Sequence, residues 1–232
     1  MADVLPNQPV LNVGVLVSGS GSNLQAILDG CQEGTIPARV TVVISNNHNV
    51  LALERARRAG VATVIVDHRQ YDKREIFEQI LANVLEQYAV QLICLAGFMR
   101  ILSPWFIRRF PGRVLNIHPA LLPAFPGLHV QQRAIEAGVR FSGATVHFVD
   151  DGVDTGPIVV QAVVPVLPED DSKTLSVRIL AQEHKIYPLA VRWYAQGRLR
   201  LEQGRVILEA GDGHGIDSAK EGEKAWIHPP AS

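Results

Sequence analysis

Short apolar runs alternate with amphipathic segments along the first half of the chain, and this alternation limits the folds available to it. The runs are rich in β-branched residues and almost continuously apolar, and they cover residues 11–18, 39–45, 61–67, 91–97 and 113–118. Strands buried on both faces have this composition, and helical segments between such strands favour parallel connections. We therefore expect an α/β protein with a doubly wound, mostly parallel sheet of the Rossmann-like kind.

After Gly138 the pattern changes to β strands and one long helix. Residues 142–150 and 156–166 predict two strands joined by an acidic loop. Ser172 is the expected N-cap of a helix that Pro188 should kink or interrupt. A hairpin is expected across Gln203 and Gly204. We divide the chain into an N-terminal extension (1–10), a main domain (11–200) and a C-terminal hairpin with a mobile, dispensable tail (201–232).

Composition excludes several classes of protein. The chain has 232 residues and a formal net charge of −1, with its basic residues scattered, so a nucleic-acid partner is not expected. Its two cysteines form no disulfide or metal pattern, and its histidines lack the spacing of a zinc site. No apolar run approaches the roughly 18 residues of a membrane span. We expect a cytoplasmic protein that binds no metal and contacts no membrane.

The segment SGSGSN, residues 18–23, follows the first predicted strand and begins a helix. Glycines allow the backbone to approach a ligand closely, and a helix N-terminus offers free N–H groups to an anion such as phosphate. Asn23 replaces the third glycine of a dinucleotide-binding motif, and no Walker lysine follows. A phosphate site and a tight turn without a ligand are equally good interpretations of this loop alone.

Asn116 and His118 are placed at the end of the fifth predicted strand, in the segment VLNIHPALLP. Residues two apart in a strand point to the same face, and ligands bind beyond the carboxyl ends of parallel strands. An asparagine amide can stabilise an oxyanion, and a histidine can move protons near neutral pH. Asp154, in the acidic loop, could reach His118, although Asp-Thr-Gly is also an ordinary turn sequence. With no nucleophile motif in the chain, these side chains suggest direct transfer between two substrates.

The segment AGFMRILSPW, residues 96–105, continues the fourth predicted strand with an apolar loop. Its side chains could line a pocket for a flat heterocycle, or they could simply pack in the core.

Five segments occur in order between Leu11 and Arg200: SGSGSN, AGFMRILSP, NIHPALLPAFPGLH, SGATVHFVDDGVDTGPIVVQ and QEHKIYP. Together they resemble the phosphoribosylglycinamide formyltransferases of purine synthesis, which formylate glycinamide ribonucleotide with 10-formyltetrahydrofolate. The resemblance implies that residues 11–200 form the catalytic domain. It also implies a cytoplasmic enzyme, monomeric or homodimeric, whose partners are two small-molecule substrates.

The same resemblance implies roles for individual residues. Asn116, His118 and Asp154 match the catalytic trio, with Asn116 and a protonated His118 stabilising the oxyanion and Asp154 raising the pKa of His118. The residues matching the ribonucleotide site are Gly21, Ser22, Asn23, Gln182 and Glu183. Those matching the folate site are Arg74, Met99, Arg100, Ile101, Leu102, Asn116, Asp150, Asp151, Gly152, Val153 and Asp154. Leu180 departs from the pattern, because a polar residue is expected at that ribonucleotide-side position.

Three other functions share parts of this pattern. A formyltetrahydrofolate hydrolase has the same Asn/His/Asp core. Such hydrolases usually carry an N-terminal regulatory domain, which the residues before Leu11 do not supply, and they lack the phosphate loop found here. A methionyl-tRNA formyltransferase is expected to carry a basic C-terminal domain, which residues 201–232 do not resemble. A binding protein with an inactive site would have no need of both His118 and Asp154.

Overall fold

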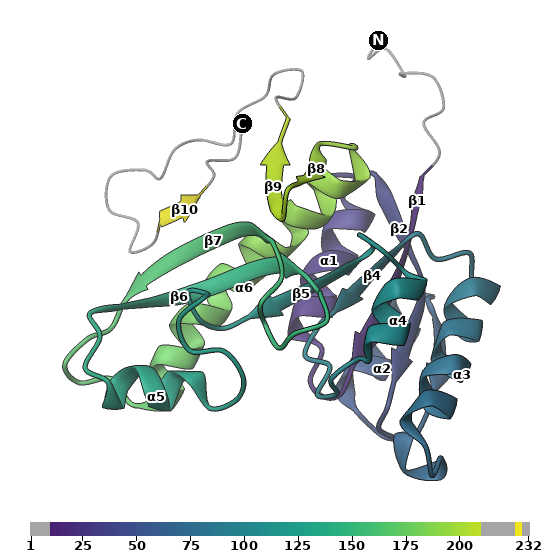
Figure 1. Ribbon diagram of the computed structural model, residues 1–232, viewed down its shortest axis with the longest axis horizontal. Helices are drawn as coiled ribbons and strands as arrows, with labels where there is room; N and C mark the ends of the chain where they lie inside the picture. The colour runs from purple at the N-terminus through teal and green to yellow at the C-terminus, as the bar shows by residue number, and fades with distance from the viewer. Residues whose placement is uncertain (1–9, 210–225, 229–232) are drawn as a thin grey trace.

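The computed structural model describes residues 10–209 and the backbone of residues 226–228. The described residues form one large sheet with helices on both faces and a separate two-stranded hairpin (Figure 1). Residues 1–9 of the predicted N-terminal extension lie outside the described part of the chain.

The large sheet has the strand order β10-β7-β6-β5-β4-β1-β2-β3. Its parallel part consists of β1 (Leu11–Val17), β2 (Ala38–Ser45), β3 (Ala62–Ile65), β4 (Leu92–Leu95) and β5 (Val114–His118). Strands β6 (Phe141–Phe148), β7 (Ile158–Pro165) and β10 (Trp226–His228) extend it in antiparallel pairing. The prediction of a doubly wound, mostly parallel α/β sheet is therefore confirmed. The strand order reverses between β1 and β4, where ligands of such sheets bind.

Two apolar clusters lie on opposite faces of the sheet. Successive side chains of β1 point to opposite faces, so Val13, Val15 and Val17 belong to one cluster and Leu16 belongs to the other. Helices α1 (Ser22–Gln32), α2 (Leu51–Arg58) and α6 (Ser172–Ala195) contribute to the first cluster, and α3 (Arg74–Gln87) and α4 (Pro104–Arg109) to the second. A Cβ at Gly14 would lie 2.8 Å from Leu85, so this glycine allows α3 to pack closely on the sheet.

Helix α6 differs from its prediction at two points. Its N-cap is Asp171 and not Ser172, because the Asp171 carboxylate accepts hydrogen bonds from the Lys173 and Thr174 amides in a capping box. Of the two expected effects of Pro188, an interruption is not found, because the helix continues through this residue to Ala195. The buried Tyr187 lies beside this proline, and its hydroxyl donates to the Leu95 and Leu115 carbonyls of the sheet. These contacts stabilise the helix at the point where proline weakens it.

The hairpin of β8 (Leu199–Glu202) and β9 (Arg205–Leu208) is confirmed, with positive φ at both Gln203 and Gly204. Most of the predicted mobile tail lies outside the described residues. Residues 226–228 form β10 and pair with β7, so at this point the chain belongs to the sheet. Three elements were not predicted, because they are too short to show a clear apolar period: α4, α5 (Val130–Glu136) and the short 3₁₀ helix at His68–Gln70.

Candidate active site

Asn116, His118 and Asp154 meet at the carboxyl end of β5. The Nδ1 atom of His118 lies 3.3 Å from Oδ2 of Asp154, and the Nδ2 atom of Asn116 lies 3.4 Å from Oδ1 of the same carboxylate. The Asp154 side chain is 14% exposed, whereas that of His118 is buried. The cluster is thus largely shielded from bulk water, with a small part of the Asp154 side chain accessible.

The loop between β6 and β7 turns back across the sheet to bring Asp154 to this place. Strand β6 runs antiparallel to β5, and the Val149 amide donates to the Val114 carbonyl near the start of β5. The loop then returns, with Asp154 at φ +56°, until its carboxylate accepts a hydrogen bond of 2.8 Å from the Gly127 amide. Asp is one of the few residues that adopts positive φ readily. Asp154 is therefore a turn residue as well as a partner of His118, and the two interpretations are compatible.

His147 is a fourth member of the cluster that sequence reasoning did not assign. It pairs with Asn116 across β5 and β6, and its Nε2 atom lies 3.1 Å from Asn116 Nδ2 and 3.6 Å from Asp154 Oδ1. Its Nδ1 atom faces the Phe148 carbonyl at 2.8 Å and so must carry a proton. In the neutral ring, Nε2 then accepts from the Asn116 amide, which fixes the orientation of that amide. Position 147 is two residues before the acidic loop, but the pairing of β6 with β5 could not be derived from spacing alone.

Opposing effects act on the charge of His118. Both ring nitrogens face oxygen atoms, those of Asp154 and of the Phe125 carbonyl at 2.9 Å, which suits an imidazolium with two N–H donors. Burial has the larger effect and lowers the pKa of His118 below 6.5. The charge of Asp154 raises this pKa, as expected, but burial outweighs it and the net shift is downward.

The Asp154 carboxylate stays ionised. Burial alone would raise its pKa, but hydrogen bonds and the neighbouring imidazoles of His147 and His118 outweigh burial, so the net shift is downward from 3.8. A carboxylate beside His118 can hold a proton-relaying water or stabilise the imidazolium when negative charge develops nearby.

The glycine loop connects β1 to α1. Gly21 has φ +71°, and a Cβ at this position would lie 2.6 Å from the Ala52 Cβ, so only glycine fits. Asn23 in the first turn of α1 donates to Glu183 of α6 at 2.7 Å, which joins two of the predicted ribonucleotide residues. Burial raises the pKa of Glu183, and the Asn23 hydrogen bond partly offsets that effect. The Asn23 Oδ1 and Gln182 Oε1 atoms are buried with no hydrogen-bond partner in the described structure, which suits a polar ligand between α1 and α6.

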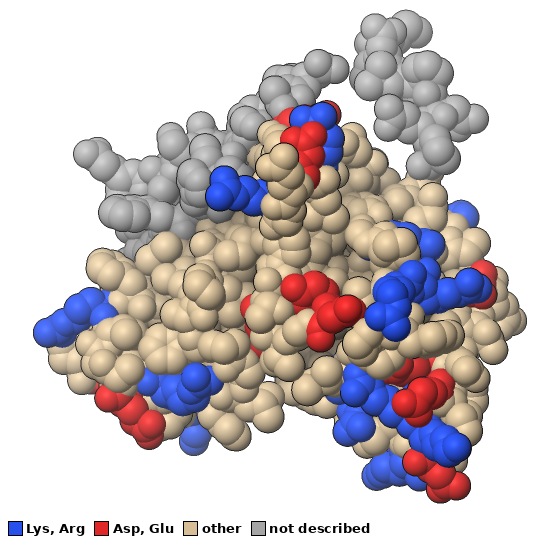
Figure 2. Space-filling model, in the orientation of Figure 1, with Lys and Arg blue, Asp and Glu red and all other residues tan. Residues whose placement is uncertain are grey.

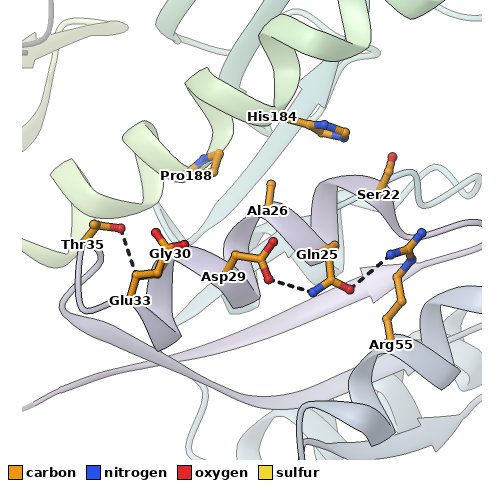
Figure 3. Close-up of a pocket in the computed structure, with 10 residues that line it drawn as sticks. All are labelled: Ser22, Gln25, Ala26, Asp29, Gly30, Glu33, Thr35, Arg55, His184 and Pro188. Atoms are coloured by element: carbon orange, nitrogen blue, oxygen red, sulfur yellow. Dashed lines mark hydrogen bonds between the residues drawn. The ribbon is translucent and has the colours of Figure 1, made fainter.

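A cavity of about 470 Å³ lies between α1, α2 and α6 (Figure 3). Ser22 lines it, together with His184 of α6 and Arg55 of α2. Burial lowers the pKa of His184, with a further contribution from Arg55, and no partner of its buried Nε2 atom is found among the described residues. The combination of Ser22, His184 and Arg55 beside a helix N-terminus could receive an anion. Sequence reasoning missed His184 and Arg55. Leu180, half-buried, lies one turn before His184 on α6.

The predicted folate residues come from four segments near the β4–β6 part of the sheet, one of which is Asn116 in β5. Arg74 begins α3, Met99 to Leu102 lie between β4 and α4, and Asp150 to Asp154 lie between β6 and β7. The Met99 and Ile101 side chains are 65% and 64% exposed, while Leu102 is buried. Arg108 of α4 lies 3.9 Å from Asp151, so the acidic loop is close to α4. Figure 2 shows acidic side chains near the centre of the drawn face, over the position of the β6–β7 loop in Figure 1.

Within the described residues, no group of three or more His, Cys, Asp or Glu side chains could hold a metal ion. No helix in that part of the chain is both long and apolar enough to cross a bilayer.

Residues 11–191 match the family model described as "Formyl transferase". The chain belongs to the formyl transferase family. Among curated relatives, this formyl transferase is 46% identical over 199 residues to the phosphoribosylglycinamide formyltransferase of Escherichia coli strain K12, covering 86% of this chain and 94% of the relative. It is 51% identical over 196 residues to the trifunctional purine biosynthetic protein adenosine-3 of Drosophila pseudoobscura pseudoobscura. That match covers 84% of this chain but 14% of the longer protein.

Solved structures agree with the family assignment. The crystal structure of glycinamide ribonucleotide transformylase 1 from Symbiobacterium toebii has a TM-score of 0.87 and 54% identity, and the match covers 90% of this formyl transferase and 99% of that chain. The phosphoribosylglycinamide formyltransferase of Coxiella burnetii has a TM-score of 0.83 and 41% identity, with 86% and 94% covered.

Proposed function

We propose that this protein transfers the formyl group of 10-formyltetrahydrofolate to the amine of glycinamide ribonucleotide, a step of purine biosynthesis. The products are the N-formyl ribonucleotide and tetrahydrofolate. The observation that carries the proposal is the cluster of Asn116, His118 and Asp154 at the carboxyl end of β5. Membership of the formyl transferase family and two relatives that carry this activity in their names support it.

The transfer needs no nucleophile from the protein. The neutral amine of the ribonucleotide attacks the formyl carbon, and the carbonyl oxygen gains negative charge. The Asn116 amide and His118 stabilise this oxyanion when an N–H of each exchanges its present partner for the substrate oxygen. The developing negative charge favours the imidazolium form of His118 against the effect of burial. Asp154, ionised beside both, orders a water molecule that relays the proton from the attacking nitrogen to the leaving nitrogen of the folate.

Each substrate has a proposed place. The phosphate and ribose lie against Gly21 to Asn23 and the Gln182–Glu183 stretch of α6. There, the buried Asn23 Oδ1 and Gln182 Oε1 atoms have no hydrogen-bond donor among the described residues. The folate lies against Arg74, the 99–102 loop and residues 150–154. Residues 11–200 are proposed as the catalytic domain of a cytoplasmic protein, either monomeric or homodimeric.

A hydrolase of 10-formyltetrahydrofolate is the competing function, because it would use the same three side chains with water as the nucleophile. The Asn23–Glu183 pair and the glycine turn at Gly21 favour the transferase, since a hydrolase has no second substrate to hold there.

Steady-state turnover of the purified protein tests the proposal. Release of tetrahydrofolate from 10-formyltetrahydrofolate is followed with and without glycinamide ribonucleotide. We expect release to depend on the ribonucleotide. Equal rates in both reactions would favour the hydrolase, and no release in either would contradict both functions.

A further inference from the structure

Glu78 of α3 is a fully buried acidic residue outside the catalytic cluster. Its side chain is 1% exposed. Carboxylates are rarely buried so completely unless they are paired and hydrogen-bonded. Glu78 meets this condition with three donors: the Arg74 Nε atom at 3.0 Å, the Ser103 amide at 2.7 Å and the Ser103 hydroxyl.

These donors belong to the segments that the proposed folate site uses. Arg74 is itself one of the proposed folate residues, and its Nε contact with Glu78 sets the orientation of the guanidinium group. Ser103 follows directly after Met99 to Leu102 and caps α4, accepting from the Phe106 amide at 3.4 Å. One carboxylate therefore holds the beginning of α3 and the end of the 99–102 loop together.

The other end of this loop is also held. The Ser18 hydroxyl accepts a hydrogen bond of 2.8 Å from the Met99 amide, and the Ser18 amide donates to the Gly97 carbonyl at 3.1 Å. Between these two anchors, the side chains of Met99 and Ile101 remain largely exposed. Exposed apolar side chains on a loop fixed at both ends form a preorganised contact surface for a ligand, because the loop loses little conformational entropy when the ligand binds.

We propose that Glu78 is a positioning residue for the folate site, which it maintains by holding Ser103 and Arg74 in place. This inference rests on the proposed function, because it assumes that the folate binds against Arg74 and the 99–102 loop. Removing the Glu78 charge would release both the guanidinium and the loop, so the folate would bind more weakly while the ribonucleotide site, between α1 and α6, stays intact.

Four variants test this inference. Glu78→Gln removes the charge, Ser103→Ala removes the hydroxyl donor, and Ser103→Thr restores a hydroxyl. Glu75→Gln makes the same chemical change as Glu78→Gln at an exposed position of the same helix. KM for each substrate, kcat, the dissociation constant for tetrahydrofolate and the thermal midpoint are measured for each variant.

We expect Glu78→Gln and Ser103→Ala to raise the KM for 10-formyltetrahydrofolate and the dissociation constant for tetrahydrofolate about tenfold, because losing one hydrogen bond to a charged group weakens binding by about this factor. The KM for the ribonucleotide should stay within about twofold of wild type. Ser103→Thr and Glu75→Gln should resemble wild type. If Glu78→Gln fails to fold, Ser103→Ala and its Thr rescue decide the question.

A purely structural role would give a different result. Unchanged folate affinity in folded Glu78→Gln and Ser103→Ala would overturn the inference, as would parallel increases of both KM values together with a lower thermal midpoint. If the wild-type protein binds tetrahydrofolate but does not formylate the ribonucleotide, the proposed function is wrong, and the tetrahydrofolate affinities of the variants still decide the role of Glu78.

Discussion

His118 and Asp154 are in direct contact, with 3.3 Å between Nδ1 and Oδ2, although one ends a central strand and the other lies in a loop between two antiparallel strands. This contact places an ionised carboxylate against a buried imidazole whose pKa is lowered. The pair can respond to negative charge that appears only during reaction, which is the property that an acyl-transfer site needs.

Asp154→Asn keeps the shape of the side chain but removes its charge. We expect kcat to fall by about 100-fold with little change in either KM, because the charge acts mainly in the transition state. Steady-state kinetics with each substrate varied in turn measures the effect. Asp72→Asn, at an exposed position outside the site, is the matched control. A rise in KM at wild-type kcat would show that Asp154 only helps to bind substrate.

His147→Ala should remove the group that orients the Asn116 amide. We expect kcat to fall by about tenfold, and we expect the effect to be largely absent in an Asn116→Ala background, because the two side chains act as a unit. A double-mutant cycle on kcat measures the coupling. The exposed His48 provides the control substitution His48→Ala. Additive effects of His147→Ala and Asn116→Ala would show that His147 acts independently of the amide.

Glu183→Gln replaces the carboxylate that accepts from Asn23. The KM for glycinamide ribonucleotide is expected to rise by about tenfold, while that for 10-formyltetrahydrofolate stays constant, because one hydrogen-bonded group between α1 and α6 is altered. Glu169→Gln, at an exposed site shortly before α6, controls for the loss of an acidic residue. An equal effect on both substrates would not fit a ribonucleotide site at this position.

The lowered pKa of His118 predicts a pH dependence of stability. Because the folded-state pKa lies below the unfolded value of 6.5, the unfolded chain binds more protons between these two values, and stability decreases as the pH falls through this window. Urea unfolding of wild type and His118→Gln at about pH 7.5 and about pH 5.5 isolates this contribution. We expect the free energy of unfolding of wild type, relative to the variant, to decrease at the lower pH. An increase would mean that the folded state favours the imidazolium.

The sequence predicted the parallel half of the sheet because its strands are short, β-branched and bounded by glycines or polar residues. It also placed Asn116 and His118 on one face, since strand geometry fixes the direction of side chains two apart. The contact of Asp154 with His118 was expected, but the path of the β6–β7 loop was not. That path depends on the positive φ of Asp154 and on the Gly127 amide, which is distant in the sequence.

The roles of side chains that depend on tertiary packing could not be predicted from the sequence either. His147 gains its role from strand pairing, and Glu78 from packing against Ser103. The continuity of α6 through Pro188 is a further case, since contacts of the neighbouring Tyr187 with β4 and β5 outweigh the local preference of proline.

Transfer of a labelled formyl group tests the proposed chemistry most directly. Wild-type protein and Asp154→Asn are incubated with glycinamide ribonucleotide and 10-formyltetrahydrofolate carrying ¹³C in the formyl group, and the products are followed by NMR. We predict that the label appears as a formamide on the ribonucleotide with wild type and does so far more slowly with Asp154→Asn. Label released as free formate, or formamide formed at the same rate by both proteins, would contradict this mechanism.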